Sequence, residues 1–260
     1  MKVHIGTSGF AHKEWNGKFY PDKIAPRDML RFYAERLNAV EINNTFYHMP
    51  TTSVLYAWAD QVPDGFVFAI KAPQVITHFK QLRNVSGESR YLFKTLSLLA
   101  GKLGPVLFQF PKSFRANMAV LEDFLALIPR DAACAFEFRS PTWLDAGMPD
   151  LLRKKGCSMC IADTDEGPVQ EIVSTAGWGY LRLRRSSYTD ADLSQWAERI
   201  RTQKWDRAFV FFKHEDAANE AKGPEMAMRL RELIDAPEHE NASGPEGYGG
   251  NIPEQGLKRG

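Results

Sequence analysis

Eight short runs rich in β-branched and aromatic residues alternate along the chain with segments of helical spacing, and this alternation constrains the fold most strongly. The runs predict strands at residues 2–8, 39–45, 66–72, 105–111, 133–139, 157–163, 179–184 and 208–214. Each is followed by a helical pattern or a helix-sized gap, the weakest helix being predicted at 167–175. This order favours an α/β fold with one domain, a (β/α)₈ TIM-type barrel, over the alternative of a doubly wound open sheet.

The length of 260 residues suits one barrel, because such barrels often fill this length as a single domain. The barrel is predicted to span residues 1–236. Residues 237–260 are rich in Gly, Pro, Glu and Asn and have almost no large apolar side chains. We therefore expect this last segment to be a disordered tail.

Composition and charge narrow the setting in which the protein works. The net charge is +1, so no global field marks a nucleic-acid or membrane partner, although a local basic patch would not be seen in this sum. No apolar run is long enough to span a bilayer, and the first ten residues lack the apolar segment of a signal peptide. Three cysteines argue against a disulfide framework. We expect a cytoplasmic protein.

A carboxylate and two amides interrupt the second predicted strand, AVEINNT. Side chains alternate between the two faces of a strand, so Val40 and Ile42 share one face and Glu41 and Asn43 share the other. In a barrel one face meets the helices and the other points to the axis. Glu41 and Asn43 are therefore predicted to face the barrel axis.

Polar residues also occur at the carboxyl ends of most other predicted strands, where barrel enzymes build their active sites. The candidate site residues are Ser8, Glu41, Asn43, Lys71, Gln109, Glu137, Arg139, Asp163, Arg182, Arg184, Lys213 and His214, with His78 from a nearby loop. Pairing of Glu41 with Lys71, or of Glu137 with Arg182, as a structural ion pair is the alternative for single members. The occurrence of the set at one end of most strands favours a site.

Cations outnumber carboxylates in this set, which predicts an anionic ligand, because arginine binds phosphate or carboxylate through two parallel hydrogen bonds. Mg²⁺ held by Glu41, Glu137 and Asp163 is conceivable, but the cationic neighbours argue against a metal site. No cofactor is implied by any motif.

Several segments resemble the YecE-like family, the TIM-barrel proteins called domain of unknown function 72. The resemblance covers about residues 1–235 and implies a (β/α)₈ barrel without an established reaction; likeness of the family to the endonuclease IV type of barrel raises nucleic acid as a ligand. It is carried by GTSGF with WNGKFYP (6–21), VEINNTFYHMP (40–50), FVFAIKAP with ITH (66–78), KLGPVLFQFP (102–111), AFEFRSPTW (135–143), ADT (162–164), YLRLRRSSY (180–188), LSQWAERI (193–200) and VFFKHED (210–216).

The chain departs from the family pattern at two strand ends. The family usually has Arg-Leu-His-Gly in the seventh strand, where this chain has Arg-Leu followed by Arg184 and Arg185. In the eighth strand Lys213 and His214 replace two asparagines. Chemistry that relies on the seventh-strand histidine could be lost here, or His214 could partly replace that histidine.

Three functional hypotheses follow, and each has a small anion or a nucleic acid as its partner. In the first, an enzyme acts on a phosphoester: arginines 139, 182 and 184 hold the anion, Glu41 or Glu137 is general base, and Lys71 or His78 is general acid. In the second, the protein binds or senses an anion without turnover. In the third, a sugar isomerase or aldolase-like enzyme uses Lys71 as a Schiff base.

Overall fold

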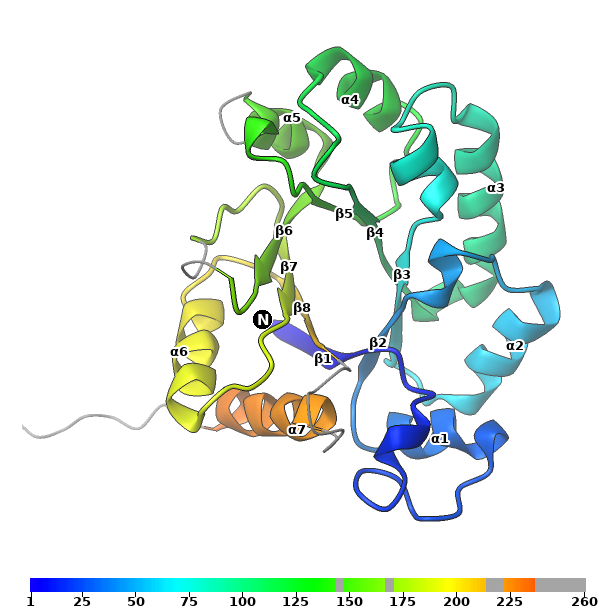
Figure 1. Ribbon diagram of the computed structural model, residues 1–260, viewed down its shortest axis with the longest axis vertical. Coiled ribbons are helices and arrows are strands. Elements are labelled where there is room, and N and C mark those ends of the chain that lie inside the picture. The colour runs from blue at the N-terminus through cyan, green and yellow to red at the C-terminus, as the bar shows by residue number, and fades with distance from the viewer. Residues whose placement is uncertain (144–146, 167–170, 214–221, 237–260) are drawn as a thin grey trace, which may run out of the picture.

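In the computed structural model, which describes residues 1–143, 147–166, 171–213 and 222–236, eight parallel strands form one closed barrel. Each strand pairs with the next along the chain, and the last pairs with the first (Figure 1). The predicted barrel is confirmed, and the open sheet is excluded. The strands are β1 Lys2–Ser8, β2 Ala39–Ile42, β3 Val67–Lys71, β4 Leu103–Gln109, β5 Cys134–Glu137, β6 Ser158–Asp163, β7 Trp178–Leu183 and β8 Arg207–Phe212.

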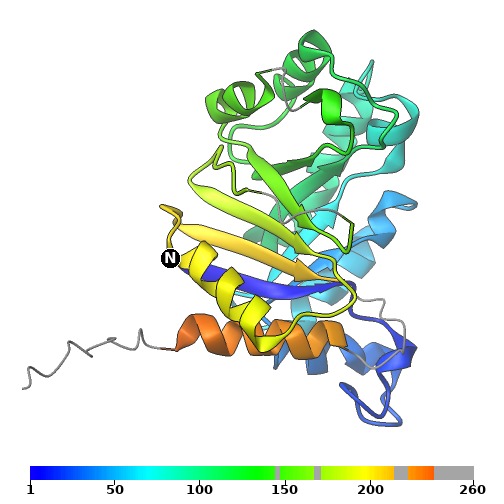
Figure 2. The same ribbon diagram turned by 60° about the vertical axis from the view of Figure 1, so that its left-hand side comes forward.

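Helices cover the outside of the barrel, and Figure 2 shows α6 (yellow) and α7 (orange) side by side, with α7 over β8 and β1. Residues 171–177, between β6 and β7, form no helix, while 167–170 and the predicted tail lie outside the described residues. None of the described helices is both long and apolar enough to cross a bilayer. The helices are α1 Met29–Ala34, α2 Thr52–Gln61, α3 Ser86–Leu96, α4 Met118–Leu125, α5 Met148–Lys155, α6 Asp190–Arg201 and α7 Lys222–Asp235.

The two faces of the strands bury different kinds of side chain. The outward face carries bulky apolar residues such as Phe108 and Phe136, whose rings stack 5.3 Å apart under the helices. The inward face is mostly apolar in the lower barrel, where Trp178, Phe209 and Leu107 fill the axis and the buried His4 ring stacks on Phe209. Polar side chains replace these apolar ones towards the carboxyl ends of the strands. This change of character creates a polar mouth over a packed lower barrel.

The second strand ends earlier than its sequence predicts. Asn43 leaves the extended conformation, with φ −94° and ψ −24°, and a 3₁₀ turn follows at Asn44–Phe46. Thr45 holds this turn in place, because its hydroxyl donates to the carbonyl oxygens of Ile42 (3.0 Å) and Lys71 (2.7 Å). The turn therefore ties the end of β2 to the end of β3.

β1 and β2 approach each other closely around Gly6. The Tyr33 hydroxyl of α1 accepts from the Thr7 N–H (2.8 Å) and donates to the Ala39 carbonyl oxygen (3.0 Å), so it bridges the two strands. A Cβ atom added at Gly6 would lie 1.8 Å from that carbonyl oxygen and 2.8 Å from the hydroxyl. Only glycine fits this position without moving the backbone.

We expect Gly6→Ala to lower the free energy of unfolding by about 3 kcal/mol or more, because overpacking against a backbone atom cannot be relieved by a rotamer change. Urea unfolding measures the loss. The matched control is Gly87→Ala in α3, where an added Cβ has no atom within 4 Å and the helix propensity of alanine is favourable. Equal midpoints for the two variants would contradict the close approach.

Candidate functional site

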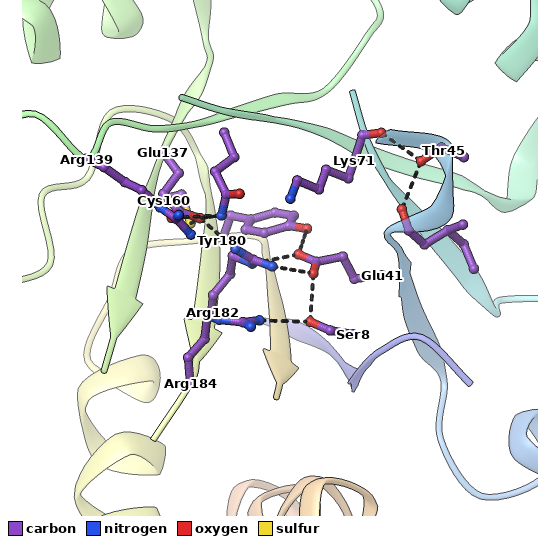
Figure 3. Close-up of polar contacts among 12 residues, drawn as sticks. Ser8, Glu41, Thr45, Lys71, Glu137, Arg139, Cys160, Tyr180, Arg182 and Arg184 are labelled. Carbon is purple, nitrogen blue, oxygen red and sulfur yellow. Dashed lines mark hydrogen bonds and ion pairs between the residues drawn. The ribbon is translucent and has the colours of Figure 1, made fainter. Parts of the chain in front are cut away.

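Arg182 on β7 joins two buried glutamates across the mouth of the barrel (Figure 3). Its Nε and Nη2 donate to the two carboxylate oxygens of Glu41 on β2, at 2.9 and 2.8 Å. Its Nη1 donates to Oε2 of Glu137 on β5 at 2.8 Å. The Arg182 side chain is 3% exposed, so the charges attract each other with little screening by water. These three residues form what we call the ion cluster.

Neutral hydroxyls complete the surroundings of Glu41. The Ser8 hydroxyl donates to Oε1 at 2.7 Å, and the Tyr180 hydroxyl donates to Oε2 at 2.8 Å. Burial alone would raise the pKa of Glu41, but the charge and hydrogen bonds of Arg182, with the Ser8 bond, hold it below its usual value. With four hydrogen bonds and a lowered pKa, Glu41 is an ionised, fully partnered carboxylate.

Glu137 is held in the same way by a different set of donors. The Gln109 amide donates to both carboxylate oxygens at 2.9 Å, and Arg139 Nε donates at 3.0 Å. Burial raises the pKa of Glu137, but the charges of Arg182 and then Arg139 outweigh burial and lower it to about 2. Arg139 differs from Arg182 because its side chain is 44% exposed and borders the solvent.

Lys71 shares this mouth but is not part of the ion cluster. Its Nζ lies 4.3 Å from the centre of the Phe46 ring, and among the described residues no hydrogen-bond acceptor or carboxylate is within bonding distance of that nitrogen. Figure 3 shows the side chain pointing from β3 towards the cluster. Burial, followed by the charge of Arg182, lowers the pKa of Lys71 to about 8.

His78 lies beside Lys71, in a π-helical turn that follows β3 (Val75–Phe79). Its ring is edge-on to Phe46, with centroids 4.9 Å apart, and Nδ1 is 2.9 Å from the Thr77 hydroxyl. Burial, then the charges of Lys71 and Arg139, lower the pKa of His78. The imidazole is therefore neutral near pH 7.

A cavity of about 790 Å³ opens over the β4–β8 side of the mouth. Arg184 and Lys213 reach it from the ends of β7 and β8, and the Arg184 Nη1 lies 3.4 Å from the Ser8 hydroxyl. The cavity is lined by Lys112, Glu137, Phe138, Arg139, Met159, Cys160, Ala162, Thr164, Asp165, Glu166, Glu171, Val173, Arg184 and Lys213.

Most of the candidate site residues thus meet at the mouth, but Asp163 and Asn43 take other positions. Asp163 shares the parity of Ile161 and faces the helical layer, where Arg185 (3.0 Å), Tyr188 and Trp196 bind its carboxylate. Asn43 leaves the strand, and its Oδ1 is buried without a partner among the described residues. His214 lies outside the described residues.

Two sequence-based predictions need correction, one about a ligand contact and one about an ion pair. Arg182 was expected to contact the ligand, yet its guanidinium is committed to Glu41 and Glu137 and is almost fully buried. The alternative pairing of Glu137 with Arg182 is present, whereas Glu41 pairs with Arg182 and not with Lys71. In the described part of the chain no three His, Cys, Asp or Glu side chains gather as metal ligands, because Asp163 faces away from the two glutamates.

Other contributors were not predicted from the sequence. Tyr180 could have been found, since it shares the inward face with Arg182 at a distance of two residues. Phe46 and Lys112 follow the ends of β2 and β4 in non-extended segments, where strand alternation gives no guidance. Cys160 is buried and also lines the cavity, and burial raises its thiol pKa.

Removing the centre of the ion cluster tests its energetic role. We expect Arg182→Met to lower the free energy of unfolding by about 3–5 kcal/mol, because two buried carboxylates lose their shared cation. Arg139→Met is the matched control and should cost about 1 kcal/mol or less, since Arg139 is half-exposed. Denaturant unfolding at pH 7 compares them, and similar losses for both variants would contradict a central role for Arg182.

The lowered pKa of Glu137 predicts acid destabilisation. Between its ordinary value of 4.5 and about 2 the unfolded chain binds a proton that the folded chain does not, so stability falls as pH falls through this window. We expect Glu137→Gln to remove up to about 3 kcal/mol of this fall. The exposed Glu122→Gln on α4 is the control. Stability curves from pH 6 to about 2 measure both, and an unchanged slope in Glu137→Gln would count against the assignment.

Comparison with known proteins places the chain in a family. UPF0759 protein YecE of Escherichia coli O157:H7 is 27% identical over 168 residues, which is 62% of this chain and 59% of that protein. UPF0759 protein YunF of Bacillus subtilis strain 168 is 28% identical over 150 residues, 54% of this chain and 52% of that protein. The chain therefore spans between half and three fifths of the length of these curated relatives.

A solved structure shares the fold. The crystal structure of a DUF72 family protein from Thermotoga maritima superposes with a TM-score of 0.78 at 22% identity, covering 91% of this chain and 100% of that one. The family described as "Protein of unknown function DUF72" matches residues 4–247. Since this match extends over most of the sequence, the chain belongs to the DUF72 family.

Proposed function

We propose that the mouth of the barrel binds a small ligand bearing a phosphate or another anionic group. The observation that carries this proposal is the charge around the ion cluster. Among the described residues, Lys71 and Arg139 adjoin Arg182 and its two glutamates, which leaves an excess of one positive charge. A bound anion would balance this excess in a partly buried, low-dielectric setting.

The titration of neighbouring groups supports the same conclusion. Burial is the main cause that lowers the pKa of His78, and the charges of Lys71 and Arg139 lower it further. Because both of these charged neighbours are cations, the potential at His78 is positive. An anion placed there would interact favourably with the same potential.

The shape and rim of the cavity favour a small anion over a polynucleotide. Arg139, Arg184 and Lys213 line the cavity together with three carboxylates, Asp165, Glu166 and Glu171, which are exposed. Those carboxylates make the lining itself balanced in charge. These carboxylates would repel an extended polyanion. A small anion beside Arg139, Arg184 and Lys213 would be close mainly to cations.

The geometry also assigns different tasks to the mouth residues. Glu41 and Glu137 are ionised and accept hydrogen bonds on both oxygens, so they hold Arg182 and the strands in place instead of titrating near neutral pH. Arg139, Arg184 and Lys213 are the predicted site cations that line the cavity. This division supports binding by the exposed cations above a fixed ion cluster.

Calorimetry with inorganic phosphate, glycerol phosphate and a short single-stranded oligonucleotide tests the proposal. We expect the double variant Arg184→Gln/Lys213→Gln to bind phosphate and glycerol phosphate at least about tenfold more weakly, because each charged hydrogen bond is worth roughly 1.5–3 kcal/mol. Arg36→Gln is the control, since Arg36 precedes β2 and lies at the opposite end of the barrel.

Salt dependence separates the two classes of ligand. A small ester should show a shallow dependence on salt and compete fully with the oligonucleotide. A polynucleotide ligand would show an affinity that falls steeply with salt, in proportion to the phosphates contacted. Absence of binding by every anion, or equal binding by the double variant, would reduce the cations to structural roles and overturn the proposal.

A further inference from the structure

We propose that Lys71 is a nucleophilic amine that forms an imine with the carbonyl group of a small aldehyde or ketone. The proposal deepens the proposed function and rests on it for the ligand's anionic group, which the mouth cations would hold. It names a substrate class, anionic carbonyl compounds, and a covalent step for a residue that the ion cluster leaves without a partner.

The first argument is that the cluster denies Lys71 a counter-ion. Two carboxylates face the same mouth, yet Glu41 accepts from Arg182, Ser8 and Tyr180. Glu137 accepts from Arg182, Gln109 and Arg139. Lys71 Nζ therefore faces the mouth with no acceptor among the described residues. A salt-bridged ammonium would be locked in its charged form, whereas this amine is available for addition to a carbonyl.

The second argument is that the amine is held in place by the fold. Lys71 ends β3 on the inward face, and its carbonyl oxygen accepts from the Thr45 hydroxyl at 2.7 Å. The same 3₁₀ turn presents the Phe46 ring 4.3 Å from Nζ. Figure 3 shows Thr45 at the base of the lysine and the amine directed towards Tyr180 and Glu41. A fixed backbone and an apolar wall on one side orient the nitrogen towards the mouth.

The third argument concerns protonation. The charged groups that face Lys71 are Arg182 and Arg139, which oppose its charge, and Glu41 and Glu137, which favour it; neutral His78 lies beside it. Burial and Arg182 prevail and lower the pKa of Lys71 to about 8. About a quarter of the amine is then neutral at pH 7.5, against about one part in a thousand for an ordinary lysine.

The covalent step balances without another reactant. The nitrogen lone pair adds to the carbonyl carbon, and the electrons of the C–O double bond move to oxygen, which takes a proton to give a carbinolamine. The C–O bond then breaks as water leaves and the C–N double bond forms. Of the three hydrogens of the starting ammonium, two depart in the water and one stays on the iminium nitrogen, so the single positive charge is conserved.

Trapping with borohydride tests the proposal, because hydride reduces an imine to a stable secondary amine. The protein is incubated with dihydroxyacetone phosphate, pyruvate or uncharged dihydroxyacetone, then reduced and mapped by peptide mass spectrometry. We expect one adduct, on Lys71, formed at least tenfold faster with the two anionic compounds and suppressed by inorganic phosphate. Its rate should rise with pH up to about 8 and level off above that value.

Variants complete the test. Lys71→Arg keeps the charge and cannot form an imine, so labelling at this site should vanish. Lys80→Met is the matched control: Lys80 lies in the loop after β3, pairs with Glu88 on the surface, and its removal should leave labelling unchanged. Labelling scattered over surface lysines, total labelling by the anionic compounds undiminished in Lys71→Arg, or a rate that keeps rising above pH 9 would overturn the proposal.

Calorimetry on the same samples separates this inference from the proposed function. Phosphate binding without an adduct on Lys71 would overturn the imine and leave anion binding intact. An adduct on Lys71 that forms equally fast with uncharged dihydroxyacetone, in a protein that binds no phosphate, would uphold the reactive amine and overturn the anionic substrate class.

Discussion

The pairing of one buried arginine with two buried glutamates determines the character of the whole mouth. Arg182, Glu41 and Glu137 come from β7, β2 and β5, and each would be costly to bury alone. Together, with Tyr180 and Gln109 filling the remaining positions, they leave no charge in the cluster uncompensated by a partner. Arg139 also pairs with Glu137, and among the described residues the cations of the mouth still outnumber these two carboxylates. The proposed binding of an anion and the lack of a carboxylate partner for Lys71 both depend on this pairing.

The architecture and the location of the site could be predicted from the sequence because both depend on local periodicity. Strand alternation is a property of neighbouring residues, so it placed Glu41, Glu137 and Arg182 on the barrel axis correctly. The same rule, applied to Asp163, would have placed it with Ile161 in the helical layer, where it lies. The pairing of Glu137 with Arg182 was named as an alternative and is present, but the partner of Glu41 could not be predicted. Glu41 is 141 residues from Arg182, and nothing local distinguishes that arginine from Lys71 as a partner for Glu41.

Arg184 and Arg185, the two consecutive arginines after β7 that depart from the family pattern, have different surroundings. Arg184 lies on the inward face, near Ser8 and the cavity. Arg185 points outward, binds Asp163 and lies over the Tyr188 ring, 5.6 Å from its centre. One therefore adds positive charge where a ligand would enter, and the other anchors the segment between β7 and α6. Replacing Arg184 would change the charge beside the cavity, whereas replacing Arg185 would loosen the segment between β7 and α6.

The ion cluster also bears on how the chain reaches its native state. Its members lie on three non-adjacent strands, and the separation of 141 residues between Arg182 and Glu41 means that their contact closes a very long loop. We expect all three groups to stay in water until the ring of strands is complete, so that burial and pairing occur together as the barrel closes. We therefore expect the ion cluster to form late in folding. Weakening it should raise the unfolding rate of the barrel more than it lowers the folding rate.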